Sequence, residues 1–388
     1  MGGTIKPRDA KELRQAVEWA LNDGVTLDVR GQGSKLAIGK PMTCDQVLDL
    51  SGLSGIVDYA PEELVVTLRA GTPMREVEAL LAQRNQMLAF EPPDLGPLLG
   101  QEAGQGTLVG AVMGNLAGPR RISAGAARDH LLGFSGVNGR GEAFKSGGKV
   151  MKNVTGYDLS KLLAGSWGTL AVLDEVSVKV LPAPDQTRTL VLRDLSDEAA
   201  VKAMCTAMGS PHDVSGAAHV DGRTALRLEG VAPSVEARLK GMRDLFAGVT
   251  RMEELGTLES RAFWRDVRDL MPLSTSGDDV VWKISCPPTE GPAIVTRIKA
   301  HRPSAKAFYD WSGGLIWLAL PETVDADHLI VRSALGSTGG HAILIRAAAN
   351  IRARVPVFQP QPAALQALTS RVKESFDPKR LFNRGRMD

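Results

Sequence analysis

The hydrophobic pattern of the N-terminal half predicts a mixture of helices and strands. Apolar residues recur at helical spacing over residues 10–23, which predicts a helix capped by Asp9 and ended by Gly24. Alternating apolar residues then predict a strand over residues 25–29 that runs into a glycine-containing loop. A longer alternating stretch predicts another strand over residues 169–181.

After Pro182-Ala183-Pro184 the pattern changes and then repeats. The order strand, helix, hairpin, helix occurs over residues 189–246 and again over residues 280–335, before a closing strand. Two tandem βαββα units would place their strands in one antiparallel sheet with helices on one face, so an α+β fold is expected. The predicted parts of the chain are two domains, 1–183 and 184–360, and a C-terminal helix and tail, 361–388.

Charge and hydropathy exclude some classes of function. The 388 residues carry 46 basic and 44 acidic side chains, for a formal net charge of +2. This balance argues against nucleic acid as a partner, since nucleic-acid-binding proteins usually carry a basic patch or tail. No stretch approaches the roughly 20 apolar residues that span a bilayer, and residues 1–7 lack the pattern of a signal peptide. A cytoplasmic location is expected, with peripheral attachment to the inner membrane left open.

The cysteines and histidines do not form a metal-binding pattern. Cys44, Cys205 and Cys286 lie far apart, and no Cys-x-x-Cys pair occurs. The six histidines include no pair at metal-ligand spacing. The cysteines are therefore expected to be reduced thiols, and neither an iron–sulfur cluster nor a metal site is expected in this chain.

Glycine-rich loops are the strongest candidates for chemistry. The first, residues 30–35, follows a predicted strand and reads Arg-Gly-Gln-Gly-Ser-Lys. Its backbone N–H groups could converge on a pyrophosphate, with Ser34 as a further donor and Arg30 or Lys35 supplying charge. A plain turn is the alternative. The loop lacks the third glycine of a dinucleotide-binding fingerprint and the spacing of a phosphate-binding P-loop.

Two further segments have the same character. Residues 106–118 are rich in small side chains that would let a flat ring or a phosphate lie against the backbone, and Thr107 and Asn115 offer hydrogen bonds. Residues 165–170 form a turn before a strong strand, where backbone groups could bind an adenine edge. The alternatives are a tightly packed loop and the ordinary start of a strand.

These segments together resemble a known family of flavoproteins. The resemblance rests on Arg30-Gly31-Gln32-Gly33-Ser34-Lys35, Gly114-Asn115-Leu116-Ala117-Gly118-Pro119-Arg120-Arg121, Lys152-Asn153-Val154-Thr155-Gly156-Tyr157-Asp158-Leu159, Gly165-Ser166-Trp167-Gly168-Thr169-Leu170, and the ending Phe376-Asp377-Pro378, Leu381-Phe382-Asn383 and Gly385-Arg386-Met387. They are similar to the vanillyl-alcohol oxidase, or p-cresol methylhydroxylase, superfamily, and within it to the FAD-binding subunits of bacterial glycolate oxidases (glycolate dehydrogenases).

The resemblance implies a two-part FAD-binding domain of the p-cresol methylhydroxylase type, followed by a smaller α+β cap domain with an antiparallel sheet. The C-terminal segment would return to the FAD domain. FAD would be held without a covalent bond, because the first glycine loop has no histidine. The residues implied in cofactor binding are Arg30, Gly31, Gln32, Gly33, Ser34, Lys35, Thr107, Leu108, Gly110, Asn115, Gly118, Gly165, Gly168 and Val172.

Two departures from the family pattern affect function. Val109 stands where members usually have glycine, which would tighten the loop. Related 2-hydroxy-acid dehydrogenases carry a histidine-rich metal motif, whereas the matching stretch here supplies His341 alone. Catalytic residues therefore stay unassigned. Substrate candidates, each with a structural alternative, are Arg120 and Arg121 as carboxylate ligands, Tyr157 and Trp264 as pocket walls, and His341.

The expected function is an FAD-binding subunit of a complex that oxidises glycolate, a small 2-hydroxy acid, to the 2-oxo acid. Its expected partners are a catalytic flavoprotein subunit and an iron–sulfur subunit. One alternative is a scaffold subunit that has lost FAD. Another is a stand-alone flavin oxidoreductase for a different 2-hydroxy acid.

Overall fold

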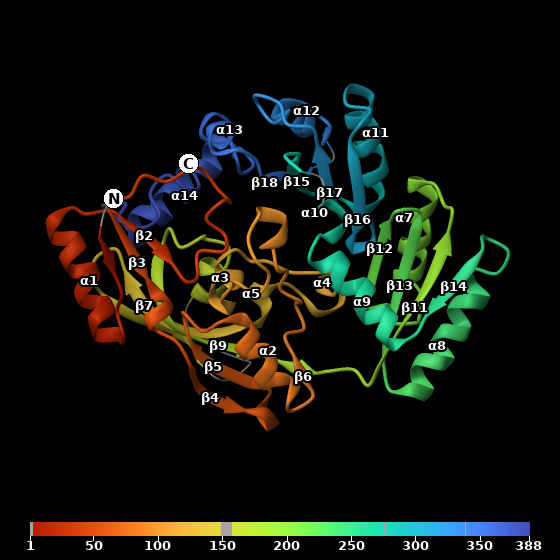
Figure 1. Cartoon of the computed structure of the whole chain (residues 1–388), viewed down its shortest axis with the longest axis horizontal. Helices are drawn as coiled ribbons and strands as arrows, with labels where there is room; N and C mark the ends of the chain where they lie inside the picture. The colour runs from red at the N-terminus through yellow and green to blue at the C-terminus, as the bar shows by residue number, and fades with distance from the viewer. Residues whose placement is uncertain (1–2, 149–156, 275–276, 338) are drawn as a thin grey trace. The chain divides into compact units, whose positions relative to one another are not determined.

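The computed structural model describes residues 3–148, 157–274, 277–337 and 339–388 (Figure 1). The chain divides into two compact units. The first unit comprises Met1–Ala117, Gly125–Ala183 and Pro360–Asp388, and the second comprises Gly118–Ala124 and Pro184–Gln359. A short segment from the N-terminal half thus belongs to the second unit.

The first unit contains two main sheets. A parallel sheet has the order β1-β3-β2, and an antiparallel sheet has the order β4-β5-β9-β7-β8. The strands are β1 (Thr4–Ile5), β2 (Leu27–Arg30), β3 (Gln46–Asp49), β4 (Ile56–Ala60), β5 (Val65–Arg69), β7 (Leu131–Asn138), β8 (Ala143–Gly147) and β9 (Ala171–Lys179), with a small ladder of β6 (Gln86–Met87) and β10 (Leu181–Pro182). The helices are α1 (Ala10–Asp23), α2 (Met74–Ala82), α3 (Leu108–Met113), α5 (Ala127–His130), α6 (Leu159–Leu163) and α14 (Ala363–Phe376).

Helix α1 confirms the boundaries expected from its sequence. The Asp9 carboxylate accepts a hydrogen bond from the Glu12 amide at 2.8 Å, which satisfies one of the amides left open at a helix start. Gly24 ends the helix in the left-handed conformation, with φ of 69°. The apolar face of α1 packs into the core of the first unit, through residues such as Leu13 and Val17.

The second unit is built on one antiparallel sheet, as the repeated pattern predicted, but with eight strands instead of the expected seven. Its order is β14-β11-β13-β12-β16-β17-β15-β18. The strands are β11 (Gln186–Arg193), β12 (Gly216–Val220), β13 (Arg223–Gly230), β14 (Met252–Leu255), β15 (Val280–Ser285), β16 (Lys306–Asp310), β17 (Leu315–Leu320) and β18 (His341–Arg346). The helices are α4 (Arg121–Ala124), α7 (Asp197–Met208), α8 (Ala232–Leu245), α9 (Thr257–Arg268), α10 (Met271–Ser274), α11 (Gly291–His301), α12 (His328–Ser333) and α13 (Ala349–Arg354).

The expectation that helices cover only one face of this sheet is wrong. Leu190 and Leu192 of β11 point into the core that also contains residues of α7, α8 and α11. Thr189, the residue before Leu190, faces the other side, because side chains alternate along a strand. There its hydroxyl lies 2.6 Å from Ser260 Oγ and accepts a hydrogen bond from Trp264 Nε1 at 2.8 Å, and both partners belong to α9. Helix α9 therefore covers the face opposite the core helices.

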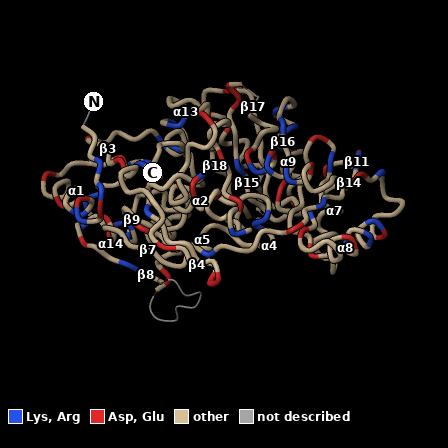
Figure 2. Tube along the Cα trace, turned by 60° about the horizontal axis from the view of Figure 1, so that its bottom comes forward, with Lys and Arg blue, Asp and Glu red and all other residues tan. Residues whose placement is uncertain are grey.

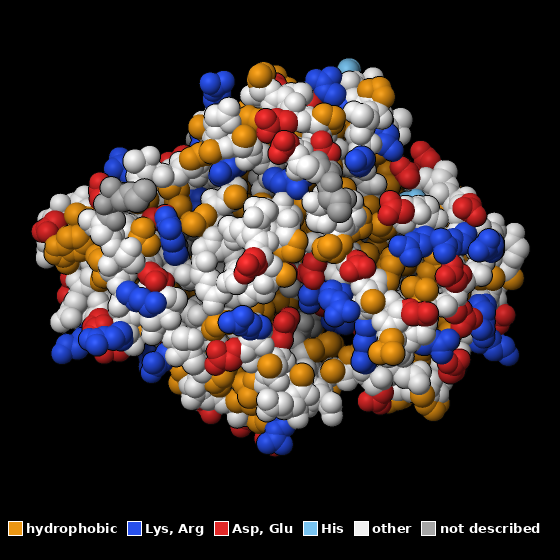
Figure 3. Space-filling model, in the orientation of Figure 1, with side chains coloured by type: hydrophobic (Ala, Val, Ile, Leu, Met, Phe, Trp, Pro, Cys, Tyr) orange, Lys and Arg blue, Asp and Glu red, His pale blue; other side chains and the backbone are white. Residues whose placement is uncertain are grey.

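Charged residues of both signs occur together over the surface. Figure 2 shows basic and acidic residues interspersed along α1 and α8, and Figure 3 shows both signs distributed among apolar side chains on the face in view. This mixture agrees with the small formal net charge of +2.

A charged network on the α9 face fixes the segment 118–124 to the sheet. Arg120 donates two hydrogen bonds to the Glu229 carboxylate, at 3.0 and 2.9 Å. Arg227 Nε lies 3.4 Å from the same carboxylate, and its guanidinium stacks over Trp264 at 4.6 Å. Burial raises the pKa of Glu229, but Arg227 and Arg120 outweigh it and lower the pKa to about 2.

Replacing Glu229 by glutamine is expected to destabilise the second unit by about 3 kcal/mol at neutral pH, because two buried guanidinium groups lose their counter-charge. The folded-state pKa of Glu229 lies below its ordinary value of 4.5. The carboxylate therefore contributes stability above about pH 4.5 and loses that contribution as the pH falls toward 2. Urea unfolding of the native chain and Glu229→Gln should differ at pH 7, and the difference should shrink below about pH 4.5 and disappear only near pH 2.

Glu253→Gln is the matched control, since Glu253 pairs with Arg193 at a half-exposed site where an ion pair is worth little. A Glu229→Gln variant no less stable than Glu253→Gln would show that the network does not anchor the segment.

Candidate functional site

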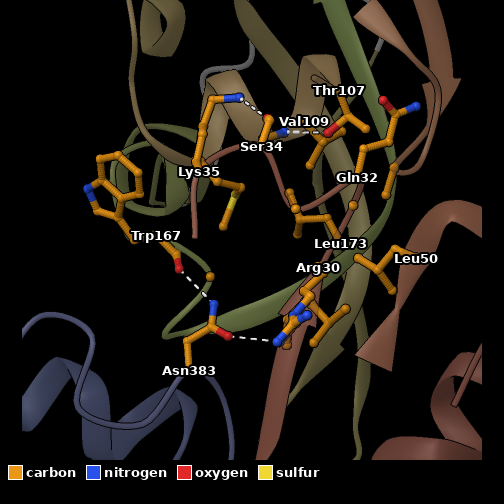
Figure 4. Close-up of a pocket in the computed structure, with 18 of the residues that line it drawn as sticks. Arg30, Gln32, Ser34, Lys35, Leu50, Thr107, Val109, Trp167, Leu173 and Asn383 are labelled. Atoms are coloured by element: carbon orange, nitrogen blue, oxygen red, sulfur yellow. Dashed lines mark hydrogen bonds between the residues drawn. The ribbon is translucent and has the colours of Figure 1, made fainter. Parts of the chain in front are cut away.

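A pocket in the first unit is lined by segments that lie far apart in the sequence (Figure 4). They are the loop after β2, the start of α3, the turn from Trp167 into β9, and two residues of the C-terminal tail, Asn383 and Arg386. The empty volume, counted out to its open mouth, is about 710 Å³. The structure thus brings the glycine loops of the N-terminal half together at one place.

All five residues of the loop Gly31–Lys35 line this pocket. Among the described residues, none accepts a hydrogen bond from the backbone amides of these five positions. Buried backbone amides normally have an acceptor, so a row of open amides at a pocket is suited to an anionic ligand. Gly33 has φ of 75°, which allows the chain to turn there without strain.

The charged residues of this loop play different parts. Arg30 turns back onto the carboxylate of Asp28, two positions earlier on the same side of the strand, so its charge is already neutralised. Lys35 Nζ lies 3.2 Å from Ser34 Oγ beside the pocket. Burial lowers the pKa of Lys35 to about 8; Asp94 opposes this effect and Arg386 adds to it. Lys35 is therefore a buried cation that a bound anion would stabilise.

Thr107 joins the first loop to helix α3. Its hydroxyl accepts a hydrogen bond from the Gly110 amide at 3.0 Å and caps the helix. A methyl group added at Gly31 would meet the Thr107 side chain at 3.0 Å, so the two segments approach as closely as glycine permits. Val109, which follows in α3, lines the pocket as well.

The C-terminal tail completes the pocket. Asn383 donates to the Trp167 carbonyl at 2.9 Å and accepts from the Val29 amide at 2.8 Å (Figure 4). A methyl group added at Gly168 would meet the Asn383 amide nitrogen at 2.7 Å. Asn383 and Arg386 were missing from the residues expected to bind the cofactor, although the ending of the chain had carried part of the resemblance.

The structure places the expected cofactor residues in two groups. Those that line the pocket are Arg30, Gly31, Gln32, Gly33, Ser34, Lys35, Thr107, Gly110, Gly168 and Val172. Those outside its lining are Leu108, Asn115, Gly118 and Gly165. Leu108 lies in the core, Asn115 accepts a hydrogen bond from the Arg128 amide, and the Gly165 amide donates to Met113. Gly118 belongs to the second unit, where its carbonyl accepts from Trp311 Nε1 at 3.0 Å.

The substrate candidates are also dispersed. Tyr157 is exposed in the first unit, and the preceding part of its motif, residues 152–156, lies outside the described residues. Trp264 is buried between α9 and the sheet of the second unit. Arg120 is bound to Glu229 in the network described above.

Arg121 and His341 belong to a cationic cluster on the α9 face of the second unit. Arg121 stacks over Trp311 at 4.3 Å, and Lys283 lies 5.3 Å from the same ring. Burial and the charge of Arg121 lower the pKa of Lys283 to about 8, against the opposing effect of Asp310. Burial, Lys283 and Arg121 likewise lower the pKa of His341. Lys283 was not among the sequence candidates.

The turn that carries Trp311 is strained. Trp311 and Ser312 both have positive φ, 50° and 61°, which side chains rarely adopt. The buried carboxylate of Asp310 accepts the Trp311 amide at 2.7 Å and holds the turn in place. Strain of this kind is often kept where it positions a side chain, which here is the indole beneath the two cations.

Neither a cluster of metal ligands nor a membrane-spanning helix occurs among the residues that the structure describes. They contain no group of three or more histidine, cysteine, aspartate or glutamate side chains placed to hold a metal ion. None of their helices is both long and apolar enough to cross a bilayer.

Comparison with known proteins identifies the family. The FAD binding domain family matches residues 2–147. The chain is 36% identical over 378 residues to the glycolate oxidase subunit GlcE of Escherichia coli strain K12, covering 97% of both chains. It is 30% identical over 188 residues to the glycolate oxidase subunit GlcD of Bacillus subtilis strain 168, covering 48% of this chain and 38% of that relative.

Solved structures show the same fold. A p-cresol methylhydroxylase with bound substrate matches with a TM-score of 0.76 at 12% identity, over 99% of this chain and 88% of that one. An alkyldihydroxyacetonephosphate synthase matches with a TM-score of 0.71 at 15% identity, over 98% of this chain and 75% of that one. The chain therefore belongs to the family of the glycolate oxidase subunit GlcE and has the fold of the FAD-binding flavoproteins of the p-cresol methylhydroxylase type.

Proposed function

We propose that this chain binds FAD without a covalent bond in the pocket of the first unit and is the FAD-binding subunit of a complex that oxidises glycolate to its 2-oxo acid. The 36% identity to GlcE over 97% of both chains supports the assignment to such a complex. The FAD binding domain match, residues 2–147, covers most of the pocket lining.

The observation that carries this proposal is the row of open amides from Gly31 to Lys35 at the pocket. A diphosphate has several oxygens that can each accept an N–H, and the Lys35 ammonium adds a charge-assisted donor. A Cβ added at Gly31 would meet the Thr107 side chain at 3.0 Å, so glycine lets the loop run this close to the start of α3. When bound, FAD would supply the two-electron acceptor, while the residues of the chain bind and orient it.

The proposed partners are a catalytic flavoprotein subunit and an iron–sulfur subunit. Cys44, Cys205 and Cys286 are free thiols in the structure and are dispersed along the chain, so a cluster that accepts electrons is proposed to lie in another subunit. The complex would work in the cytoplasm or attached peripherally to the inner membrane.

A second candidate function is favoured by the cationic cluster of Arg121 and Lys283. Two cations stacked on one buried indole are suited to the carboxylate of a 2-hydroxy acid, so the chain would then oxidise such a substrate by itself. Adding glycolate anaerobically to the isolated flavoprotein separates the two functions. Bleaching of the flavin only in the presence of the partner subunits supports the proposed function, whereas bleaching of the isolated chain supports the second.

FAD binding is tested by the visible spectrum of the purified chain. The proposal predicts the two absorption bands of oxidised flavin, either as purified or after FAD is added. Added FAD should also stabilise the fold by roughly 2.7 kcal/mol at about one hundred times its dissociation constant. A colourless protein that takes up no FAD would instead support a scaffold that has lost the cofactor.

The role of the first loop is tested by Gly33→Ala with Gly100→Ala as control. Both glycines have nearly the same left-handed φ, 75° and 73°, so each substitution should cost about 1 kcal/mol of stability. Only Gly33 lines the pocket. Gly33→Ala is expected to weaken FAD binding roughly tenfold, about 1.4 kcal/mol, in a fluorescence titration, while Gly100→Ala should bind normally. Equal affinities in the two variants would contradict the assignment of this loop.

The affinity for FAD should depend on pH through Lys35. Its pKa of about 8 in the free protein means that the ammonium is present below pH 8 and is lost above it. Since a bound diphosphate favours the charged form, affinity should stay constant below pH 8 and fall by up to about tenfold per pH unit above it. Lys35→Met should bind more weakly and lose this dependence, whereas Lys11→Met, on the exposed surface of α1, should retain it.

A further inference from the structure

Arg386, the third residue from the C-terminus, is buried and reaches back to the loop that follows β2. Its Nη2 donates to the Lys35 carbonyl at 2.6 Å, and its Nε donates to the Ile38 carbonyl at 3.2 Å. The backbone carbonyl of Arg386 accepts a hydrogen bond from the Lys40 amide at 3.0 Å. One residue of the tail therefore holds three points of the first loop and its continuation.

The same guanidinium also reaches the opposite wall of the pocket. It lies over the indole of Trp167, 5.1 Å from the ring centroid, where a cation is attracted to the aromatic face. Trp167 has a positive φ of 54° and opens the turn that leads into Gly168 and β9. Arg386 thus contacts both the loop that contains Lys35 and the turn that contains Trp167.

The tail is fixed up to this point by its own anchors. The Asp377 carboxylate accepts the amides of Leu381 and Phe382 at 2.9 and 3.0 Å, and Phe382 is fully buried in the core of the first unit. The backbone N–H of Asn383 then donates a hydrogen bond to the Leu27 carbonyl of β2 at 3.0 Å. After Asn383 the tail is held by the contacts of Arg386 together with others, such as the one between Met387 Sδ and the Thr169 hydroxyl at 3.8 Å.

The fit of the backbone around Arg386 is close. A methyl group added at Gly39 would meet Arg386 Cγ at 2.7 Å and its carbonyl oxygen at 2.9 Å, and Gly39 has φ of 93°. Only glycine is compatible with both the conformation and the contact. The path of the loop beyond Lys35 is therefore shaped to receive the arginine.

From these contacts we propose that Arg386 is a positioning residue for the cofactor: it clamps the first glycine loop and the Trp167 turn at a fixed separation, so that ordering of the C-terminal tail and binding of FAD favour each other. This inference rests on the proposed function, since FAD is the ligand placed between the two walls. The physical basis is preorganisation, because a loop already held in its binding geometry loses less conformational freedom when the ligand binds. By linkage, a ligand that favours the clamped state must also stabilise the tail.

The test compares Arg386→Met, which keeps the apolar stem, with Arg386→Lys and with the control Arg384→Met. Arg384 is exposed, is two residues away, and does not line the pocket. Arg386→Met is expected to bind FAD about tenfold more weakly. Arg386→Lys should not restore the affinity, because an ammonium cannot bridge two carbonyls and stack on the indole at once. Arg384→Met should bind like the native chain.

Three measurements distinguish a positioning role of Arg386 from a general loss of stability. FAD should slow carboxypeptidase digestion of the native tail at least tenfold, as followed by intact mass, and should give no such protection in Arg386→Met. The pH at which FAD affinity begins to fall should move upward in Arg386→Met, because the arginine helps to lower the pKa of Lys35. Trp167→Leu combined with Arg386→Met should lose less affinity than the sum of the single losses, since the two side chains act as one clamp.

The outcomes separate this inference from the proposed function. A native chain that binds no FAD refutes both. A native chain that binds FAD without protecting its tail, or an Arg386→Met variant that binds as tightly as Arg384→Met, refutes the clamp alone. Additive losses in the double variant also refute it, because they would show that Arg386 and Trp167 contribute independently.

Discussion

The backbone amides of Gly31–Lys35 have no acceptor among the described residues, and they open on a pocket. A buried N–H without a partner costs free energy comparable to a lost hydrogen bond, so a run of them has to be held in place by its surroundings. Thr107 approaches the loop from α3, and Arg386 holds its carbonyls from the tail. These contacts hold the loop in the place where it lines the pocket.

The second unit holds two different clusters of basic side chains on one face of its sheet. Arg120 and Arg227 share the carboxylate of Glu229, so their charge is compensated and the segment 118–124 is anchored. Arg121 instead stacks on Trp311 near Lys283, where burial and the charge of Arg121 lower the pKa of Lys283 to about 8. The two adjacent arginines cannot be told apart in the sequence. In the structure Arg120 binds the carboxylate of Glu229, whereas Arg121 stacks on the indole of Trp311.

Local signals in the sequence predicted the elements that depend on local interactions. Asp9 and Gly24 bound α1 because capping is decided within a few residues. The repeated order of strand, helix, hairpin and helix predicted a single antiparallel sheet, but it missed the edge strand β14. Helix α9 was missed, although Gly256 and Glu259 form a start signal, because it lies in residues 247–279, between the two repeated units. The polar residue Thr189 in β11 was the only hint that a second face is covered.

The site was predictable only in part, because its long-range contacts leave no local trace. The glycine loops could be found, since their composition is itself unusual. No pattern in the sequence predicts that Arg386 contacts Lys35, which lies 351 positions earlier. The same holds for the contact of Lys283 with Trp311. Asn115 and Gly118 were expected at the cofactor from the resemblance, but the structure places them outside the pocket lining.

The most direct test of the account is hydrogen–deuterium exchange of the backbone amides with and without FAD. Gly31–Lys35 should exchange rapidly in the free protein, since those amides lack a protein acceptor, and should become strongly protected when FAD is bound. Tight binding of FAD that leaves the exchange of these five amides unchanged would contradict the central claim.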